Sequence, residues 1–235
     1  MRDIPEFFKN GYTLGGKVRV IDYYFNEGAN RRYYHYPRDF VEMFINKAKD
    51  KKTLHYENTD PFLYEALDKH SIKGKTVLIQ GSEEPCYEAL AFLNGAESVT
   101  MVEYQKVTTD YPNFEIMTAE DFSESNGKYD CAFSISSVEH SGLGRYGDDL
   151  DPEGDLKAMD DLRSRLNSGG LCFLAVPMGE DCVFWNAHRQ YGRVRFPMLI
   201  KGFEVIGEYG WQDSDFDILA RKGLTKQPVI VLRKI

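Results

Sequence analysis

The most regular pattern in the chain is an alternation of short apolar runs with amphipathic segments. Residues 77–79 form an unbroken apolar run that ends at Gly81, and the largely apolar segment 86–93 follows Pro85. A short apolar run bounded by a glycine is typical of a buried parallel strand, and the segment after it of a crossover helix. Pro85 suits the first helical position, where its missing N–H has no partner to lose. The pattern therefore predicts a strand–turn–helix unit over residues 76–93.

The alternation continues to residue 176. Apolar residues at helical spacing predict a helix over about 156–166, with Asp155 as its cap. Further apolar runs predict strands over residues 99–102, 114–117, 129–135 and 171–176. Repeated units of this kind predict an α/β fold, a Rossmann-like, doubly wound and mostly parallel sheet that binds ligands at the carboxyl ends of its strands. The last two runs, 203–211 and 228–234, have no helix between them and predict a C-terminal antiparallel hairpin.

The N-terminal part of the chain has a different pattern. Apolar residues at helical spacing predict two helices, over about 40–48 and 61–69, and aromatic residues cluster near both. We interpret residues 1–73 as an N-terminal helical cap or extension that packs on a main domain over residues 74–235. The aromatic residues of the extension either cover a pocket there or bury ordinary helix and sheet surface.

Composition narrows the classes of function. The chain has 235 residues and a formal net charge of −8, which gives no general attraction to a phosphate backbone. No apolar run approaches the roughly 20 residues needed to cross a bilayer, and the first residues lack the apolar segment of a signal peptide. The four cysteines form no CxxC pair, so no structural zinc site is expected. We expect a cytoplasmic protein with a small-molecule or glycan substrate and neither nucleic-acid nor membrane partners.

The first strand and the second predict a nucleoside cofactor. Glu103 ends the second strand about twenty residues after Gly81, and a carboxylate at that distance can accept hydrogen bonds from ribose hydroxyls. The loop 81–85 has one glycine and two carboxylates, Glu83 and Glu84. These carboxylates would repel the pyrophosphate of a dinucleotide, whereas a sulfonium and an α-amino group tolerate them. The loop therefore favours S-adenosylmethionine over a dinucleotide.

The order of these features resembles a class I S-adenosylmethionine-dependent methyltransferase over roughly residues 74–235. The resemblance rests on the loop at Gly81, the acidic end of the second strand, the acidic step 119–121, the turn 166–170 and the closing hairpin. More narrowly, segments 136–147, 151–155 and 184–192 resemble the domain-of-unknown-function 268 (DUF268) family. The methyltransferase loop usually carries two or three glycines, and positions 82–85 carry none. The resemblance implies S-adenosylmethionine as the cofactor and gives eight candidate residues around it. Gly81 and Ser82 would lie at the methionine part, Glu103 at the ribose, and Tyr104 with either Glu120 or Asp121 at the adenine. Ser136 and Ser137 would border the sulfonium.

Methyl transfer to a hydroxyl group needs a base close to the acceptor oxygen. His140 follows the fourth strand and is the first candidate, with His188, after the fifth strand, as the second. Arg145 and Arg189 are predicted to contact the substrate as fork-shaped donors, together with Tyr146.

A magnesium ion is a further option, because oxygen-bearing side chains of Glu139, Asp181 and Asn186 follow strands at the same end of the sheet. No tight spacing supports it, and we expect no metal.

These observations lead to one preferred function and two alternatives. The preferred function is an S-adenosylmethionine-dependent O-methyltransferase with a histidine base. Its acceptor is predicted to be small and polar, most simply a carbohydrate hydroxyl, because the loops near the site are polar and no basic surface is evident. A non-catalytic methyltransferase-like module that binds a partner or glycan is the first alternative, motivated by the glycine-poor loop. A dinucleotide-dependent oxidoreductase is the second, and Glu83 and Glu84 disfavour it.

Overall fold

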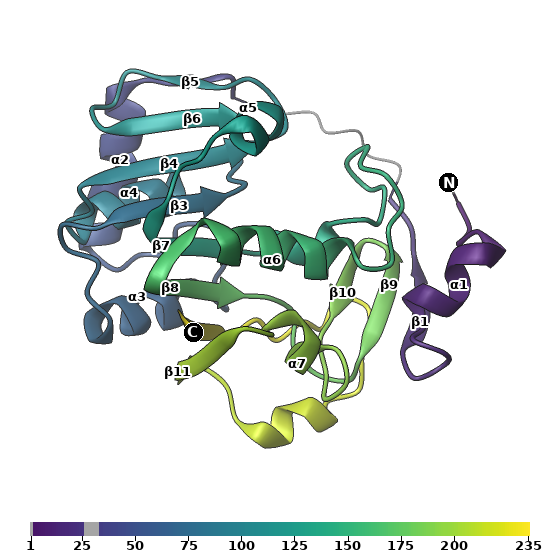
Figure 1. The fold of residues 1–235 in the computed structure, drawn as a ribbon. Coiled ribbons are helices and arrows are strands. Elements are labelled where there is room, and N and C mark those ends of the chain that lie inside the picture. Colours follow the sequence, from purple (N-terminus) through teal and green to yellow (C-terminus); the bar gives the residue numbers. More distant parts are fainter. Residues whose placement is uncertain (1, 26–32) are drawn as a thin grey trace.

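The computed structural model describes residues 2–25 and 33–235, and its central feature is a seven-stranded sheet. The strands lie in the order β11-β12-β8-β7-β3-β4-β6 (Figure 1). Their bounds are β3 Thr76–Gln80, β4 Ser98–Glu103, β6 Phe114–Thr118, β7 Tyr129–Ile135, β8 Leu166–Ala175, β11 Phe203–Tyr209 and β12 Val229–Lys234. Each strand predicted from an apolar run is present.

Pairing directions confirm a doubly wound, mostly parallel sheet. Strand β3 pairs in parallel with β4 on one side and β7 on the other, and the parallel pairing extends to β6 and β8. Strand β12 runs antiparallel to both β8 and β11, as the predicted C-terminal hairpin requires. The chain fills the sheet outward from β3 to β6 and then returns to begin again at β7. The switch in strand order therefore lies between β3 and β7, where sheets of this kind bind ligands.

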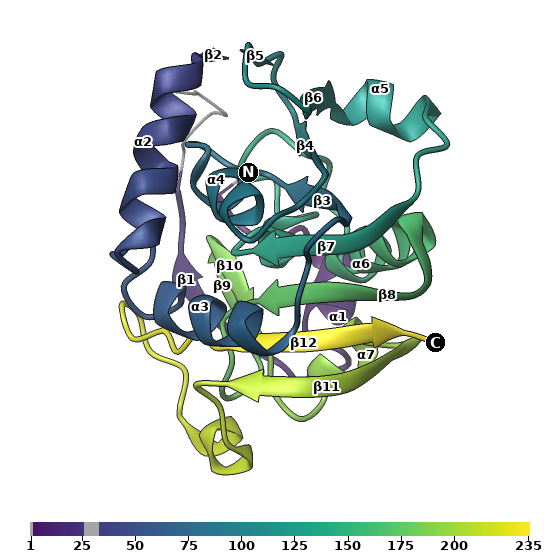
Figure 2. The same cartoon turned by 90° about the vertical axis from the view of Figure 1, so that its left-hand side faces the viewer.

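Two layers of helices cover the sheet. Val77 and Ile79 of β3 pack on one face against α2, α3 and α4, whereas Leu78 between them packs on the other against α5, α6 and α7. Figure 2 shows the two layers on opposite sides of the strands. The helices are α2 Arg38–Lys49, α3 Asp60–Lys69, α4 Cys86–Leu93, α5 Ala119–Glu124, α6 Gly154–Arg165 and α7 Phe196–Leu199. Side chains alternate between the faces of a strand, so a run that is apolar throughout serves both layers.

The N-terminal segment is less helical than the sequence predicted. It contains α1 (Glu6–Tyr12), α2 and α3, but also β1 (Arg19–Tyr23) and β2 (His35–Tyr36). Strand β1 pairs in parallel with β9 (Cys182–Asn186), which pairs in turn with β10 (His188–Gln190); β2 pairs with β5 (Thr108–Thr109). Both pairings join segments far apart in the sequence. No local hydrophobic pattern predicts strands β1 and β2, because β1 is half exposed and β2 has only two residues.

The predicted cap of α6 is wrong. Asp155 lies inside the first turn of α6, and Glu153 occupies the position before the helix. The Asp155 side chain is fully buried and accepts hydrogen bonds from Arg195 and the hydroxyl of Tyr191. These bonds direct the carboxylate to interior partners and away from the N–H groups at the start of the helix.

None of the helices within residues 2–25 and 33–235 combines the length and apolarity needed to cross a membrane. All four cysteines are free and buried.

Candidate active site

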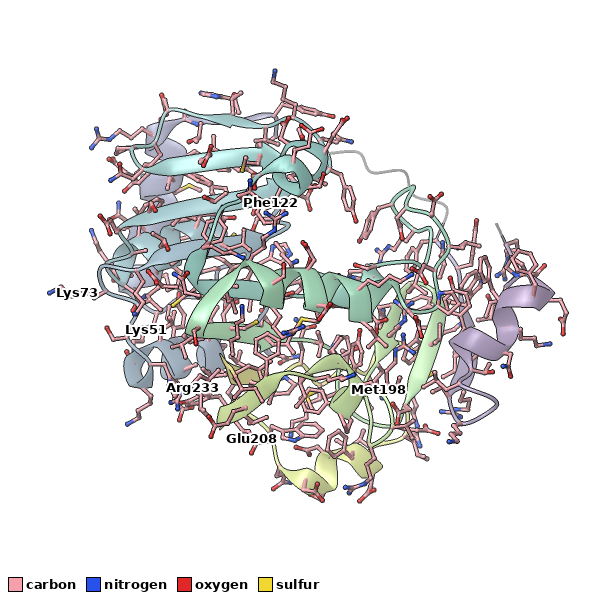
Figure 3. All side chains as sticks on the ribbon, in the orientation of Figure 1. Lys51, Lys73, Phe122, Met198, Glu208 and Arg233 are labelled. Atoms are coloured by element: carbon pink, nitrogen blue, oxygen red, sulfur yellow. The ribbon has the colours of Figure 1, made fainter. Side chains whose placement is uncertain are left out.

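A cavity of about 550 Å³ opens at the carboxyl ends of β3, β4 and β7, at the switch in strand order. This volume is in the range of small-molecule sites, about 300–1,000 Å³. We call it the strand-end cavity. Phe122 of α5, labelled in Figure 3, is one of its lining residues. The lining also includes His55, Tyr56, Gln80, Gly81, Ser82, Glu83, Glu84, Cys86, Glu103, Tyr104, Ala119, Ser123, Ser136, Ser137, His140, Ser141, Tyr146 and Asp148.

The loop after β3 brings bare backbone to the cavity. Gly81 has a φ of +62°, and a Cβ added there would lie 3.5 Å from the Ser137 hydroxyl oxygen. The hydroxyl of Tyr36 donates to the carbonyl oxygens of Ser82 and Glu83, at 3.0 and 2.8 Å, and so fixes the loop from the N-terminal segment. Among the described residues, the buried Gln80 side-chain oxygen has no hydrogen-bond partner. A ligand that carries N–H or O–H groups would satisfy this acceptor.

At the end of β4, the structure brings two of the predicted residues to the cavity. Glu103 and Tyr104 both line it, and the Glu103 carboxylate accepts the Tyr104 backbone N–H at 2.8 Å. Glu120 and Asp121 do not line it. Thr118 caps the start of α5: its hydroxyl oxygen accepts the backbone N–H of Asp121 at 3.1 Å, and its hydroxyl donates to the Asp121 carboxylate at 2.7 Å. The residues of this step that reach the cavity are Ala119, Phe122 and Ser123.

The end of β7 is strained at the cavity wall. Ser136 has a φ of +52°, in the left-handed region that disfavours residues other than glycine. Its hydroxyl donates to the Glu139 carboxylate at 2.8 Å, and its backbone N–H donates to the carbonyl of Ala175 at 2.8 Å. Such conformations cost about 1–3 kcal/mol and cluster at functional sites. Ser136 and Ser137 both line the cavity, and their contact with a sulfonium stays a prediction.

His140, at the end of the single-turn helix η1 (Val138–His140), lines the cavity. Its Nδ1 lies 2.7 Å from the carbonyl oxygen of Ala187. A carbonyl only accepts, so Nδ1 carries the proton and Nε2 of the neutral ring carries none. Burial lowers the pKa of His140 to about 3, against the opposing effect of the Ala187 carbonyl. The ring is therefore neutral near pH 7 and presents one unprotonated nitrogen.

Glu139 lies behind His140, in the interior. Its side chain is 1% exposed, and its Oε1 is 3.7 Å from Nε2 of His140. Burial raises the pKa of Glu139 to about 7, and the Ser136 hydroxyl bond offsets part of that effect. Glu139 does not line the cavity, and its carboxyl group faces the neighbouring imidazole instead.

Arg145 and Tyr146, two of the predicted substrate contacts, are neighbours in the chain. Only Tyr146 lines the cavity. The Tyr146 ring meets the His140 ring edge to face at 5.5 Å between centroids. The Arg145 guanidinium lies over the rings of Phe25 and Tyr146, and it also donates to the Ala187 carbonyl at 3.2 Å. Arg145 therefore braces the loop that carries Tyr146 and adds positive charge near His140.

The other predicted residues of the acceptor side lie in the interior. Arg189 is fully buried and donates to backbone carbonyls of Ser141 and Asp151, at 2.6 and 3.1 Å. We assign it a structural role in place of the predicted substrate contact. The His188 ring packs 4.8 Å from that of Phe184, outside the cavity lining, and burial lowers its pKa to about 4.

The residues considered for magnesium do not converge. The Asp181 carboxylate accepts backbone N–H groups of residues 192, 194 and 195, at 2.8–2.9 Å. The Asn186 side-chain oxygen accepts the N–H of Phe25 at 2.8 Å. Glu139 is held by Ser136, so each of the three side chains has a separate partner.

Sequence reasoning missed several cavity residues, and three of them are informative. Gln80 directly precedes the predicted glycine turn, and its place at a strand end was a usable signal. His55 and Tyr56 come from the segment between α2 and α3. Only the packing of the N-terminal segment on the sheet brings them to the cavity, which supports a pocket-covering role for that segment.

Comparison with solved structures identifies the fold. One similar structure is a complex between the Haloferax volcanii Trm112 methyltransferase activator and a protein assigned as a methyltransferase. The matching chain of that complex is 17% identical to this chain, with a TM-score of 0.51. The match covers 84% of this chain and 96% of that chain. An S-adenosylmethionine-dependent methyltransferase from Mesorhizobium loti is 12% identical, with a TM-score of 0.48 and coverage of 73% and 97%. The fold is that of class I methyltransferases, and at these identities the likeness shows the fold alone.

A third solved structure is SMU.776, assigned as a methyltransferase and complexed with SAH (S-adenosylhomocysteine). It is 15% identical, with a TM-score of 0.49 and coverage of 77% of this chain and 50% of that chain. The chain thus spans about half the length of SMU.776, and likewise 47% of a protein from Streptococcus mutans assigned as an S-adenosylmethionine-dependent methyltransferase. No curated protein matches the sequence. A family model described as "Caenorhabditis protein of unknown function, DUF268" matches residues 74–235.

Proposed function

The chain belongs to the DUF268 family, and we propose that it is an S-adenosylmethionine-dependent O-methyltransferase. The observation that carries the proposal is the strand-end cavity: it lies at the switch in strand order of a methyltransferase fold, and His140, whose Nε2 is unprotonated, lines it. The fold alone would allow many chemistries, so the site residues have to support the function.

The residues of the cavity fit this cofactor. Gly81 leaves room for close backbone approach, Gln80 offers a buried unpartnered oxygen, and the Glu103 carboxylate stands at the end of β4 for ribose hydroxyls. Glu83 and Glu84 line the same cavity and favour a cation over a pyrophosphate. Tyr104, Ser136 and Ser137 would complete the contacts, whereas Glu120 and Asp121 lie away from the cavity. When bound, the cofactor supplies an electrophilic methyl group on a sulfonium.

His140 is the general base of the proposal. Its Nδ1 proton is held by the Ala187 carbonyl, which fixes the ring and leaves Nε2 to accept the proton of an acceptor hydroxyl. The imidazolium that forms has the Glu139 carboxyl group 3.7 Å away. Burial disfavours that cation most and lowers the pKa of His140 to about 3, and the nearby Arg145 disfavours it further. An ionised Glu139 offsets part of this cost. His188 is not placed to replace His140.

The acceptor we propose is a carbohydrate hydroxyl. The wall beside His140 carries Tyr146, a flat aromatic ring of the kind on which sugar rings can pack, and polar groups of Ser141 and Asp148. The Asp148 carboxylate accepts the backbone N–H groups of Gly142 and Gly144, at 2.7 and 3.2 Å. It therefore holds the loop that positions Tyr146.

The test is methyl transfer from methyl-labelled S-adenosylmethionine to a panel of monosaccharides and oligosaccharides, each product being identified by its mass. We expect His140→Ala to lower turnover about 10²–10⁴-fold, typical of a lost general base, with unchanged affinity for S-adenosylhomocysteine. His35→Ala is the matched control, because His35 is exposed on β2 outside the cavity lining. Full activity of His140→Ala would remove His140 from the mechanism. Cofactor binding without transfer to any acceptor would favour the non-catalytic binding module.

A further inference from the structure

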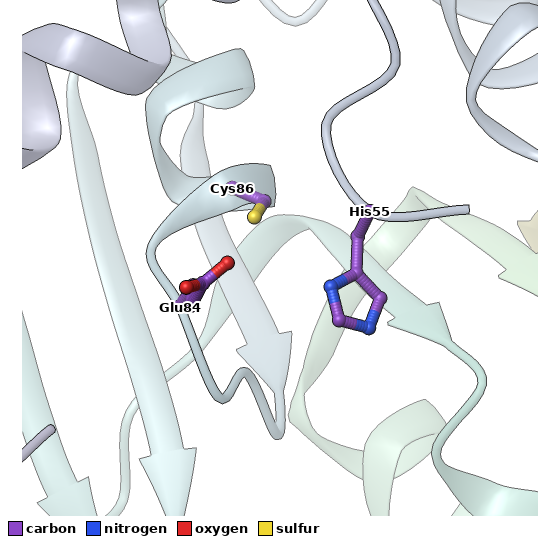
Figure 4. A group of neighbouring side chains, drawn as sticks. All are labelled: His55, Glu84 and Cys86. Atoms are coloured by element: carbon purple, nitrogen blue, oxygen red, sulfur yellow. The ribbon is translucent and has the colours of Figure 1, made fainter. Parts of the chain in front are cut away.

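Three potential metal ligands of different chemistry meet on one wall of the strand-end cavity. His55, Glu84 and Cys86 each offer a donor atom, and the three atoms lie within 4.8 Å of one another. In the part of the chain that the structure describes, this is the one such group of three. Figure 4 shows Glu84 on the loop that leads into α4, Cys86 at the start of that helix, and His55 on a separate segment opposite them. All three residues line the cavity.

A buried carboxylate ties together the two segments that carry this cluster. Oδ2 of Asp60 accepts the backbone N–H groups of residues 54–56, at 2.6, 2.8 and 3.2 Å, and so fixes the backbone of His55. Oδ1 of Asp60 accepts the hydroxyl of Tyr87, which follows Cys86 in α4, at 3.2 Å. Asp60 is 1% exposed. The frame is therefore set before any ion arrives, which reduces the cost of binding.

The donor set selects the kind of ion. A thiolate, an imidazole and a carboxylate suit Zn²⁺, whereas Mg²⁺ and Ca²⁺ prefer oxygen ligands alone. Zinc lies about 2.0–2.3 Å from such ligands. Atoms already within 4.8 Å of one another reach those distances through small side-chain rotations.

The charge around Cys86 matches a cation. Glu84 and the buried Glu88 place carboxylates near the Cys86 thiol, and these negative charges favour a divalent cation. Binding of the ion by a thiolate releases the thiol proton to solvent.

We propose that His55, Glu84 and Cys86 form a Zn²⁺ site with three protein ligands and a fourth position open to the strand-end cavity. Structural zinc sites are closed by four protein ligands, whereas sites with three protein ligands leave room for water or a bound molecule. A cavity ligand that carries a carboxylate or amino group can take the fourth position. The site does not depend on methyl transfer, because its three ligands come from the protein itself.

The experiment is a titration of chelator-treated full-length protein with Co²⁺ and then Zn²⁺, without S-adenosylmethionine. We expect one equivalent of Co²⁺ to give a thiolate-to-cobalt charge-transfer band, and Zn²⁺ to abolish that band by displacing the cobalt. Cys86→Ser should lose the band. His55→Ala should weaken Zn²⁺ binding by more than about 100-fold, since loss of an outer-shell partner alone costs about 10–100-fold.

Two controls separate the cluster from the other thiols and imidazoles. Cys182→Ser changes a buried cysteine of β9, and His35→Ala changes an exposed histidine; both should bind zinc as the parent does. His55 is exposed, so His55→Ala tests the site even where Cys86→Ser fails to fold. A parent protein without the band, or a His55→Ala variant with unchanged zinc affinity, would overturn the site. Neither result touches the methyltransferase proposal, which is tested with the cofactor.

Discussion

Replacing Asp155 by asparagine should remove the charge that neutralises two buried guanidinium groups. The side chains of Asp155 and Arg189 are fully buried and that of Arg195 is 2% exposed. Arg195 donates to Asp155 through two nitrogens, at 2.8 and 2.5 Å, and Arg189 Nε lies 3.6 Å from Asp155 Oδ1. Arg189 also holds the Ser141 carbonyl of the loop after His140. The ion-pair cluster thus supports the wall of the proposed active site.

Removing one partner of a buried ion pair lowers the free energy of unfolding by about 3–5 kcal/mol, because the remaining charge stays buried without compensation. For a chain of this length each kcal/mol lowers the melting temperature by about 2–4 °C, so Asp155→Asn should melt about 6–20 °C below the parent. Asp160→Asn, on the exposed side of the same helix, should stay within about 0.5 kcal/mol. Thermal unfolding followed by circular dichroism measures both variants. An Asp155→Asn variant within about 1 kcal/mol of the parent would refute the reasoning.

The pH dependence of the same variant gives an independent check. Burial alone would raise the pKa of Asp155, but Arg189 and Arg195 outweigh it and hold the pKa below the ordinary value of 3.8. A lowered carboxyl pKa contributes stability that is complete above pH 3.8 and disappears as the pH falls through the folded-state value. The difference between parent and Asp155→Asn should therefore shrink below pH 3.8.

Two further predictions concern the cavity. Gly81→Val should abolish S-adenosylhomocysteine binding, because the valine side chain would enter the cavity beside Ser137. Gly74→Val is the control: Gly74 has a similar positive φ with open space around it, so this variant should keep binding. Calorimetry measures both affinities, and equal affinities would contradict the placement of the cofactor. Glu139→Gln should stabilise the protein increasingly from about pH 4.5 to 7, because burial raises the Glu139 pKa to about 7 and ionisation then favours the unfolded state. Denaturant unfolding across that range, with Glu124→Gln as the exposed control, should show no pH-dependent gain if this reasoning is wrong.

Most of the sheet could be predicted because each strand has a local signal. The apolar residues of β3 and β7 are buried on both faces, so their runs are continuous and stand out from the neighbouring sequence. The predicted cofactor residues at the ends of β3, β4 and β7 reach the cavity for the same reason: once the strands are placed, parallel pairing brings their carboxyl ends together.

The remainder depends on contacts between distant segments. Strand β1 is half exposed and pairs with β9, which lies more than 150 residues later in the sequence. No local hydrophobic periodicity indicates this pairing. The sequence around Asp155 predicts a helix cap. Only the contacts of Asp155 with Arg189 and Arg195, which are distant in sequence, make it part of a buried ion-pair cluster. His55 reaches the cavity for a similar reason, through the packing of the N-terminal segment on the sheet.

Cofactor binding in the strand-end cavity is the central requirement of the proposed methyltransferase function. Isothermal titration of S-adenosylhomocysteine into the purified full-length protein tests it directly, with a reduced nicotinamide dinucleotide as the competing ligand. We expect saturable binding of S-adenosylhomocysteine at one site per chain and no binding of the dinucleotide. A folded protein that gives no heat with S-adenosylhomocysteine, or that binds the dinucleotide instead, would contradict the central claim.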